Sequence, residues 1–384
     1  MAARIDQAGE ERLARFESLR ALAALGVLAG HAWGLHHAYG PSGYDTLPER
    51  LIYGGGYGVF VFFALSGYLL FRPLARAAFG AGERIDLAGY ARNRALRIVP
   101  LYVVVAAVLF VVEGGGGSPG EWLRFATFTQ NFFSDTVLDL DAPMWSLIIE
   151  VQFYVLLPLV ALGLAWVSRR RLGLAAAFLV VAGLAGVALR LWLLQGRDVT
   201  DPRVVYSLAT TSFFFVPGML LALARAREEP VRLPGLVGSS DAWAVASIAA
   251  WVFVLDRFNV EPLAAVASFL TVGALALPLR PGRLVALLDA RALAVVGVAS
   301  YSLYLWHLPL VESVGRHVST GLPAMFGVAV PLSIALALVS YRAVEAPFLR
   351  LRRRWARPAA SVSAPRGRAV APPALSPRTR APSP

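Results

Sequence analysis

Residues 16–36 read FESLRALAALGVLAGHAWGLH, an apolar run that carries Arg20 and His31. A run of this length is enough to cross a bilayer, because about 20 helical residues span its hydrocarbon core. The two side chains are eleven residues apart, which is three helical turns plus about 20°, so both would lie on one helix face. Ionisable groups inside a membrane span are costly and usually functional. This run therefore predicts a membrane helix with a polar pair facing the protein interior.

Similar runs recur along the whole chain. Hydrophobic residues make up 57% of its 384 residues and charged residues only 16%, whereas an ordinary soluble domain has about 45–50% and about 25%. We expect an all-α polytopic membrane protein with about ten transmembrane helices, since a bilayer can solvate this much apolar surface. The predicted spans begin near residues 16, 54, 97, 145, 172, 204, 242, 260, 292 and 324.

The arginines predict the orientation of these spans. If alternate connections lie on the same side, 27 of the 36 basic residues fall on one side, six on the other and three within spans. Cytoplasmic connections carry the excess of positive charge, so we expect both termini in the cytoplasm of a multi-pass protein of the inner or plasma membrane. The predicted division is a cytoplasmic segment 1–15, a membrane domain 16–349 and a basic, Pro- and Arg-rich disordered cytoplasmic tail 350–384.

Composition also excludes several classes of function. The chain has no cysteine, which excludes disulfides, thiolate catalysis and cysteine-ligated metals, and we predict no metal site. The net charge of +12 comes entirely from arginine and is explained by membrane topology. No nucleic-acid-binding motif accompanies it, so the expected partner is membrane lipid rather than nucleic acid.

Three ionisable residues on different predicted spans lie at one depth. Glu150 is about 8 Å into the fourth span from outside, and His31 and His307 fall in the outer part of the first and ninth spans. At the inner boundary, Arg94 and Arg97 begin the third span. Together with Arg20 they would suit the phosphates of an anionic ligand, because guanidinium groups match phosphate geometry. Taken singly, Arg94 and Arg97 are better explained as topology signals, and Arg20 is explained about equally well by a side chain that reaches back to the lipid headgroups.

These residues leave other functions open. The main alternative is a proton-coupled transporter or flippase of a glycan or small molecule, in which His31, Glu150 and His307 relay protons. The sequence shows neither an inverted repeat nor a matched pair of broken helices, which such transporters often contain. A membrane glycosyltransferase is a third possibility, with Asp45 and Glu49 in the first outward loop.

Six short blocks favour an enzyme. They occur in the following order: RFESLRA at 15–21 leading to His31, FFALSGY at 62–68, RALR at 94–97 followed by PLY at 100–102, WSLIIE at 145–150, SYSLYLWH at 300–307 and EAPF at 345–348. In this order they resemble the acyltransferase family 3 of integral membrane O-acyltransferases. One departure is Glu17-Ser18, where the family often has Asp-Gly.

The resemblance implies a ten-span enzyme that moves an acyl group, often acetyl, from cytoplasmic acyl-CoA to a hydroxyl of a sugar or glycosylated acceptor. Acyl-CoA would be a co-substrate, and no tightly bound cofactor is expected. By resemblance, His31 is the catalytic histidine, Arg20, Arg94 and Arg97 bind the CoA end, and Glu150 occupies the family's acidic position. The sequence contains no secreted hydrolase-like domain, so we expect an arrangement without one, and it predicts neither the acceptor nor the oligomeric state.

These roles suggest a mechanism. An imidazole is suited to accept a proton at neutral pH, so His31 would act as general base on the acceptor hydroxyl; an acyl-histidine intermediate is the less favoured variant. Glu150 would orient His31 or hold the sugar. The remaining predicted site residues are Ser66 and Gly67 beside the passing thioester arm and, on the acceptor side, Ser146, Tyr304 and His307.

Overall fold

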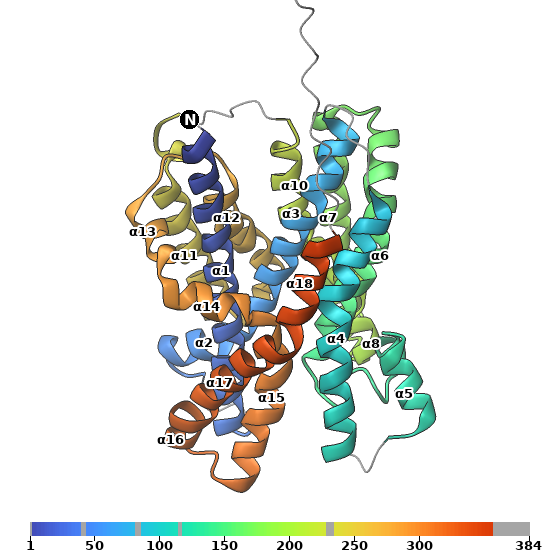
Figure 1. The fold of residues 1–384 in the computed structure, drawn as a ribbon, viewed down its shortest axis with the longest axis vertical. Helices are drawn as coiled ribbons and strands as arrows, with labels where there is room; N and C mark the ends of the chain where they lie inside the picture. The colour runs from blue at the N-terminus through green and yellow to red at the C-terminus, as the bar shows by residue number, and fades with distance from the viewer. Residues whose placement is uncertain (1, 40–43, 81–85, 114–116, 228–233, 356–384) are drawn as a thin grey trace, which may run out of the picture.

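The computed structural model describes residues 2–39, 44–80, 86–113, 117–227 and 234–355. Every regular element within these ranges is helical, and one isolated backbone bridge joins Ser239 to Arg280. Figure 1 shows the long helices running along the vertical axis, with α14 lying across them. Most of the predicted disordered tail, residues 356–384, lies outside the described residues.

Six helical stretches in the described part of the chain are long and apolar enough to cross a membrane. A seventh consists of α14 and α15, which meet at a bend of 74°. The helices concerned are α1 (Ala2–His36), α2 (Leu47–Tyr53) with α3 (Gly58–Phe79), α4 (Leu87–Glu113), α6 (Met144–Val167), α7 (Leu172–Leu194), the bent pair α14 (Arg291–Val298) and α15 (Ser300–His317), and α16 (Leu322–Ala324), α17 (Val330–Ser340) and α18 (Ala346–Trp355).

The spans predicted near residues 204, 242 and 260 form shorter or interrupted helices. The first is divided by two breaks before Pro217, and the second has 17 residues. The elements are α8 (Pro202–Val205), α9 (Leu208–Thr211), α10 (Val216–Ala224), α11 (Ser240–Asp256) and α12 (Ala264–Ala276); the remaining short helices are α5 (Pro119–Ala126) and α13 (Arg283–Ala286).

The outer surface of the bundle is apolar. Trp166 on α6 is 82% exposed and Leu184 on α7 is 65% exposed. Water would solvate such contiguous helix faces poorly, whereas lipid tails match them. The composition and the structure together therefore define a multi-pass membrane protein, as the sequence predicts.

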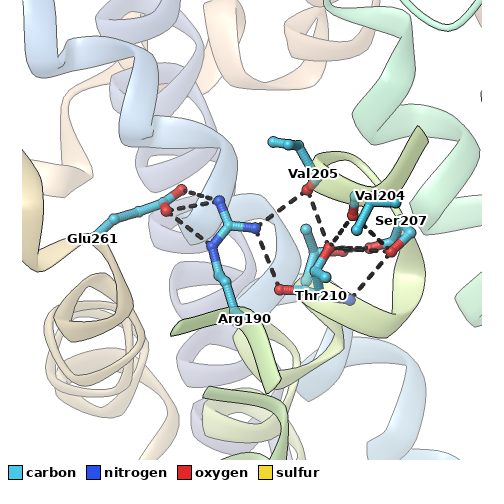
Figure 2. Close-up of polar contacts among 7 residues, drawn as sticks. Arg190, Val204, Val205, Ser207, Thr210 and Glu261 are labelled. Atoms are coloured by element: carbon cyan, nitrogen blue, oxygen red, sulfur yellow. Dashed lines mark hydrogen bonds and ion pairs between the residues drawn. The ribbon is translucent and has the colours of Figure 1, made fainter. Parts of the chain in front are cut away.

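A partly buried ion pair holds α8 and α9, the first two pieces of the interrupted segment, in place (Figure 2). The Arg190 guanidinium on α7 donates to both carboxylate oxygens of Glu261, with a shortest distance of 2.7 Å. Its remaining amine donates to the backbone carbonyls of Val205 and Thr210, at 3.2 and 3.4 Å. All three nitrogens are thereby satisfied, so this membrane-buried arginine has a structural explanation.

Close backbone contacts fix α1 and α3. A Cβ atom at Gly30 would lie 2.7 Å from the Tyr53 carbonyl oxygen, so glycine allows α1 to touch the turn that joins α2 to α3. On the other side of the bundle, a Cβ at Gly67 of α3 would overlap the Phe215 carbonyl oxygen just before α10. Because these contacts involve rigid backbone, they fix the helices that carry Arg20, His31 and Ser66.

Candidate active site

His31 and His307, two of the predicted site residues, are in direct contact. His31 Nδ1 on α1 lies 3.0 Å from His307 Nε2 on α15, and the ring centroids are 5.0 Å apart. His307 is only 1% exposed, whereas His31 keeps a partly exposed surface. This confirms that the two histidines lie at one level, and His31 is the more exposed of the two residues.

The helical turn of α15 that precedes His307 connects the His31–His307 pair to the start of α6. The Tyr304 hydroxyl donates to the Pro143 carbonyl at 3.0 Å and lies 2.6 Å from the Ser146 hydroxyl. The Tyr304 and His307 rings are 5.6 Å apart. Ser146, Tyr304 and His307, which were all predicted on the acceptor side, therefore form one connected cluster beside His31.

Tyr304 also lines a cavity of about 90 Å³. It is formed by α1, α3, α4, α6 and α15, and it has room for a few water molecules or a small chemical group. Seven of the ten predicted site residues line it, namely Arg20, Ser66, Arg94, Arg97, Ser146, Glu150 and Tyr304. The structure thus brings the predicted CoA-binding arginines together with the predicted acid.

The three arginines of this cavity differ in their contacts. Arg20 donates from Nε to the Ser300 hydroxyl at 3.1 Å and lies over the Phe62 ring, 5.7 Å from its centroid. Arg94 lies 6.0 Å from the centre of the Tyr154 ring, and its Nε has no hydrogen-bond partner among the described residues. Donors are therefore left for a bound ligand.

Arg97 has a partner that sequence reasoning did not place in the site. Its guanidinium lies 2.9 Å from the carboxylate of Glu345, which is 2% exposed. Glu345 also accepts from the Ser302 hydroxyl and backbone amide, at 2.5 and 3.1 Å. The signal that would have found Glu345 is its position as the acid of the EAPF block, at the end of the π-helical turn Tyr341–Glu345.

Glu150 faces the cavity rather than the histidine pair. The Ser66 hydroxyl donates to its carboxylate, and the Tyr154 hydroxyl lies 3.5 Å from Ser66 Oγ. In the described structure the side chain in contact with His31 is His307, so the structure does not bring Glu150 to His31. The predicted catalytic role of Glu150 stays a prediction.

Gly67 lies outside the cavity wall. Its contact with the Phe215 backbone is explained by the packing of α3 on α10. Its predicted role beside the thioester arm stays a prediction, and the same holds for the acyl-CoA roles of Arg20, Arg94, Arg97 and Ser66.

A second, larger cavity of about 880 Å³ lies at the other end of α4. Its wall includes Val108 and Phe110 of α4, Glu121 of α5, and Trp306 and Ser313 of α15. Arg97 and Val108 are eleven residues apart on α4, or about 16 Å along a helix axis. The two cavities therefore approach α15 from opposite ends, one at Tyr304 and the other at Trp306.

The fold and the site define an integral membrane protein in which a histidine pair lies beside an arginine-lined cavity. A family model described as an acyltransferase domain matches residues 13–342. The chain therefore belongs to the acyltransferase family 3 that its sequence blocks resemble.

Curated relatives have related names. The chain is 26% identical to the O-acetyltransferase OatA of Staphylococcus aureus, in an alignment that covers 86% of this chain and 56% of OatA. It is also 26% identical to YrhL of Bacillus subtilis, named a putative peptidoglycan O-acetyltransferase, over 86% of this chain and 54% of YrhL. The chain spans about half the length of these relatives. No solved structure matches it.

Proposed function

We propose that this protein is a membrane O-acyltransferase that moves acetyl, or another short acyl group, from acyl-CoA to a hydroxyl of a sugar or glycosylated acceptor. The observation that carries the proposal is that Tyr304 lines the arginine-lined cavity while its ring lies 5.6 Å from that of His307, which contacts His31. The O-acetyltransferase names of the relatives support the same reaction.

The donor would bind from the end of the bundle that carries Arg94 and Arg97. Arginine is well suited to the phosphates of CoA, and Arg94 retains unused donors. The cavity volume of about 90 Å³ favours a short acyl group over a long chain.

The acceptor would approach through the larger cavity. Phe110 and Trp306 offer apolar ring surface there, while Glu121 and Ser313 offer polar groups, a mixture that suits ring-shaped polar ligands. This cavity includes Trp306, the residue before His307 on α15, and the acceptor would approach His31 from that side.

In the proposed reaction the acceptor oxygen attacks the thioester carbonyl carbon. His31 takes the hydroxyl proton as general base. When the carbon–sulfur bond breaks, the protonated His31 returns that proton to the departing thiolate, so the products are the acyl ester and free CoA. Arg20, which lines the donor cavity, would bind the CoA end, because it lies eleven residues, or about 16 Å along a helix, from His31.

We further propose ten membrane crossings with both termini in the cytoplasm of an inner or plasma membrane. The bent pair α14–α15 and the shorter helices α10, α11 and α12 would complete the crossings beyond the six long ones. The excess of arginine on one side of the alternating connections supports this orientation.

Label transfer tests the function. Membranes that contain the full chain are supplied with radiolabelled acetyl-CoA and with membrane glycans or cell-wall precursors, and sugar fractions are then analysed for alkali-labile label. We expect label in a sugar ester. Absence of transfer from acetyl-CoA and from other short acyl-CoA donors, together with proton-coupled uptake of a solute, would instead identify a transporter.

A further inference from the structure

His307 is closed to substrate. Its side chain is 1% exposed, and its two ring nitrogens are both occupied, Nδ1 by the Tyr304 carbonyl at 2.7 Å and Nε2 by His31 at 3.0 Å. A ring in this position can act on the reaction only through His31. The acceptor-side role that the sequence predicts for His307 stays a prediction.

The carbonyl of Tyr304 fixes the proton on His307. A carbonyl oxygen accepts only, so His307 Nδ1–H is the donor in that contact. Neither ring has a carboxylate partner among the described residues, and a buried cation without one is costly, so the neutral form of His307 is favoured. In neutral His307 with a protonated Nδ1, the Nε2 atom carries a lone pair and accepts.

The proton position on His31 follows. Since His307 Nε2 accepts, the atom 3.0 Å away, His31 Nδ1, is the donor. A neutral imidazole carries one ring proton, so His31 Nε2 is unprotonated. That nitrogen is the only position from which His31 can remove a proton from an acceptor hydroxyl.

We propose that His307 is a positioning residue that holds His31 in its Nδ1–H tautomer and thereby keeps His31 Nε2 available as the base. The chain of contacts runs from the Tyr304 carbonyl through His307 to His31, whose ring also has a backbone hydrogen bond with Val27. The hydrogen bond on one histidine nitrogen commonly sets the protonation of the other. The role rests on the proposed function, because it specifies how His31 performs general base catalysis.

Nitrogen NMR tests the tautomer without any assay of activity. The full chain is labelled with ¹⁵N-histidine, reconstituted in lipid vesicles and assigned by comparison with His31→Ala. We expect His31 to show a protonated Nδ1 and an unprotonated Nε2, and His307→Ala to lose that preference. A protonated Nε2 on His31 in the unmodified protein would overturn the proposal even if acyl transfer were demonstrated.

Kinetics separates positioning from packing. We expect His307→Ala to lower kcat about 10- to 100-fold, with the KM values for both substrates within about twofold. His307→Gln should recover most of this loss, because an amide oxygen accepts from His31 and an amide N–H can donate to Tyr304. Unchanged kcat in His307→Ala, or an equal loss in both variants, would contradict the role.

A matched control is available on α1. His36 also has a ring nitrogen bonded to a backbone carbonyl, that of Thr320 at 2.8 Å, but it is outside the proposed machinery. His36→Gln should leave kcat unchanged. If acyl transfer is never detected but the NMR tautomer is as expected, the proposed function fails while the hydrogen-bond assignment stands.

Discussion

Arg190 and Arg94 are both arginines within apolar helices, yet their surroundings differ. Arg190 is 7% exposed, and Glu261 and two carbonyls use all its nitrogens (Figure 2). Arg94 faces a cavity, lies over the Tyr154 ring and has a buried Nε without a hydrogen-bond partner in the described structure. A membrane-buried arginine is thus a structural group where the fold satisfies it and a candidate ligand-binding group where donors remain.

Removing Arg190 should have the largest effect on stability. Arg190→Leu leaves the Glu261 carboxylate, which is 23% exposed, without its partner. Breaking a fully buried ion pair costs about 3–5 kcal/mol, so we expect a smaller loss for this partly buried pair. We expect a clearly lower thermal midpoint in detergent, with unchanged KM values in the remaining folded protein. The double variant Arg190→Leu/Glu261→Gln should regain much of the stability, and a selective loss of acyl-CoA binding instead would make Arg190 part of the site.

Removing Arg97 should affect binding and stability together. Arg97→Ala takes a cation from the donor cavity and leaves the buried Glu345 without it, so we expect about a 10- to 100-fold rise in KM for acyl-CoA and a lower thermal midpoint. Adding Glu345→Gln should restore stability but not KM. A larger rise in KM for the acceptor than for acyl-CoA would mean that Arg97 serves topology rather than the donor.

Removing Arg94 should affect binding alone. Its guanidinium has no carboxylate partner to leave behind in the described residues, so Arg94→Gln should raise KM for acyl-CoA about 10-fold and leave the thermal midpoint nearly unchanged. The KM of Arg94→Lys for acyl-CoA should lie between those of the wild type and Arg94→Gln. If stability falls as much as in Arg190→Leu, the contrast between the two arginines is wrong.

Removing a surface ion pair should have the smallest effect on stability, and that effect should depend on pH. Two hydrogen bonds from Arg15, at 2.7 and 2.8 Å, lower the pKa of Asp289 below its usual value. A lowered carboxyl pKa contributes stability above the unfolded value of about 4, and that contribution is lost as the pH falls through the lower folded value. Because the pair is partly exposed, Asp289→Asn should cost at most about 1 kcal/mol at neutral pH. The thermal midpoints of the wild type and Asp289→Asn should therefore converge at acid pH. If they still differ at pH 2, the stabilisation does not come from the ionised Asp289 carboxylate.

Helical periodicity and the expected depth of residues in the membrane predicted much of the candidate site. The spacing of Arg20 and His31 placed both on one helix face, and the matched depth of His31 and His307 placed them at one level. The shared face and the shared level follow because rise and rotation per residue are nearly constant along a helix. Rotation about each helix axis is set by packing, so the sequence did not show that Glu150 faces Ser66 while His307 faces His31.

Irregular backbone was harder to predict. The bend between α14 and α15 brings Ser300 to Arg20, and the π-helical turn Tyr341–Glu345 ends at the carboxylate that Arg97 contacts. Hydropathy measures only apolar length, so it predicted span positions but neither of these breaks. The distinction between Arg190 and Arg94 likewise depends on partners far away in the sequence.

Turnover by His31→Ala is the most direct test of the account. Wild type and variant are reconstituted at equal folded amounts in vesicles, and acyl transfer from labelled acetyl-CoA to a sugar acceptor is followed. Because His31→Ala removes the proposed general base, we expect its rate of transfer to fall about 10²- to 10⁴-fold. Binding of acyl-CoA should be retained. Transfer by His31→Ala at a rate close to that of the wild type would contradict the account.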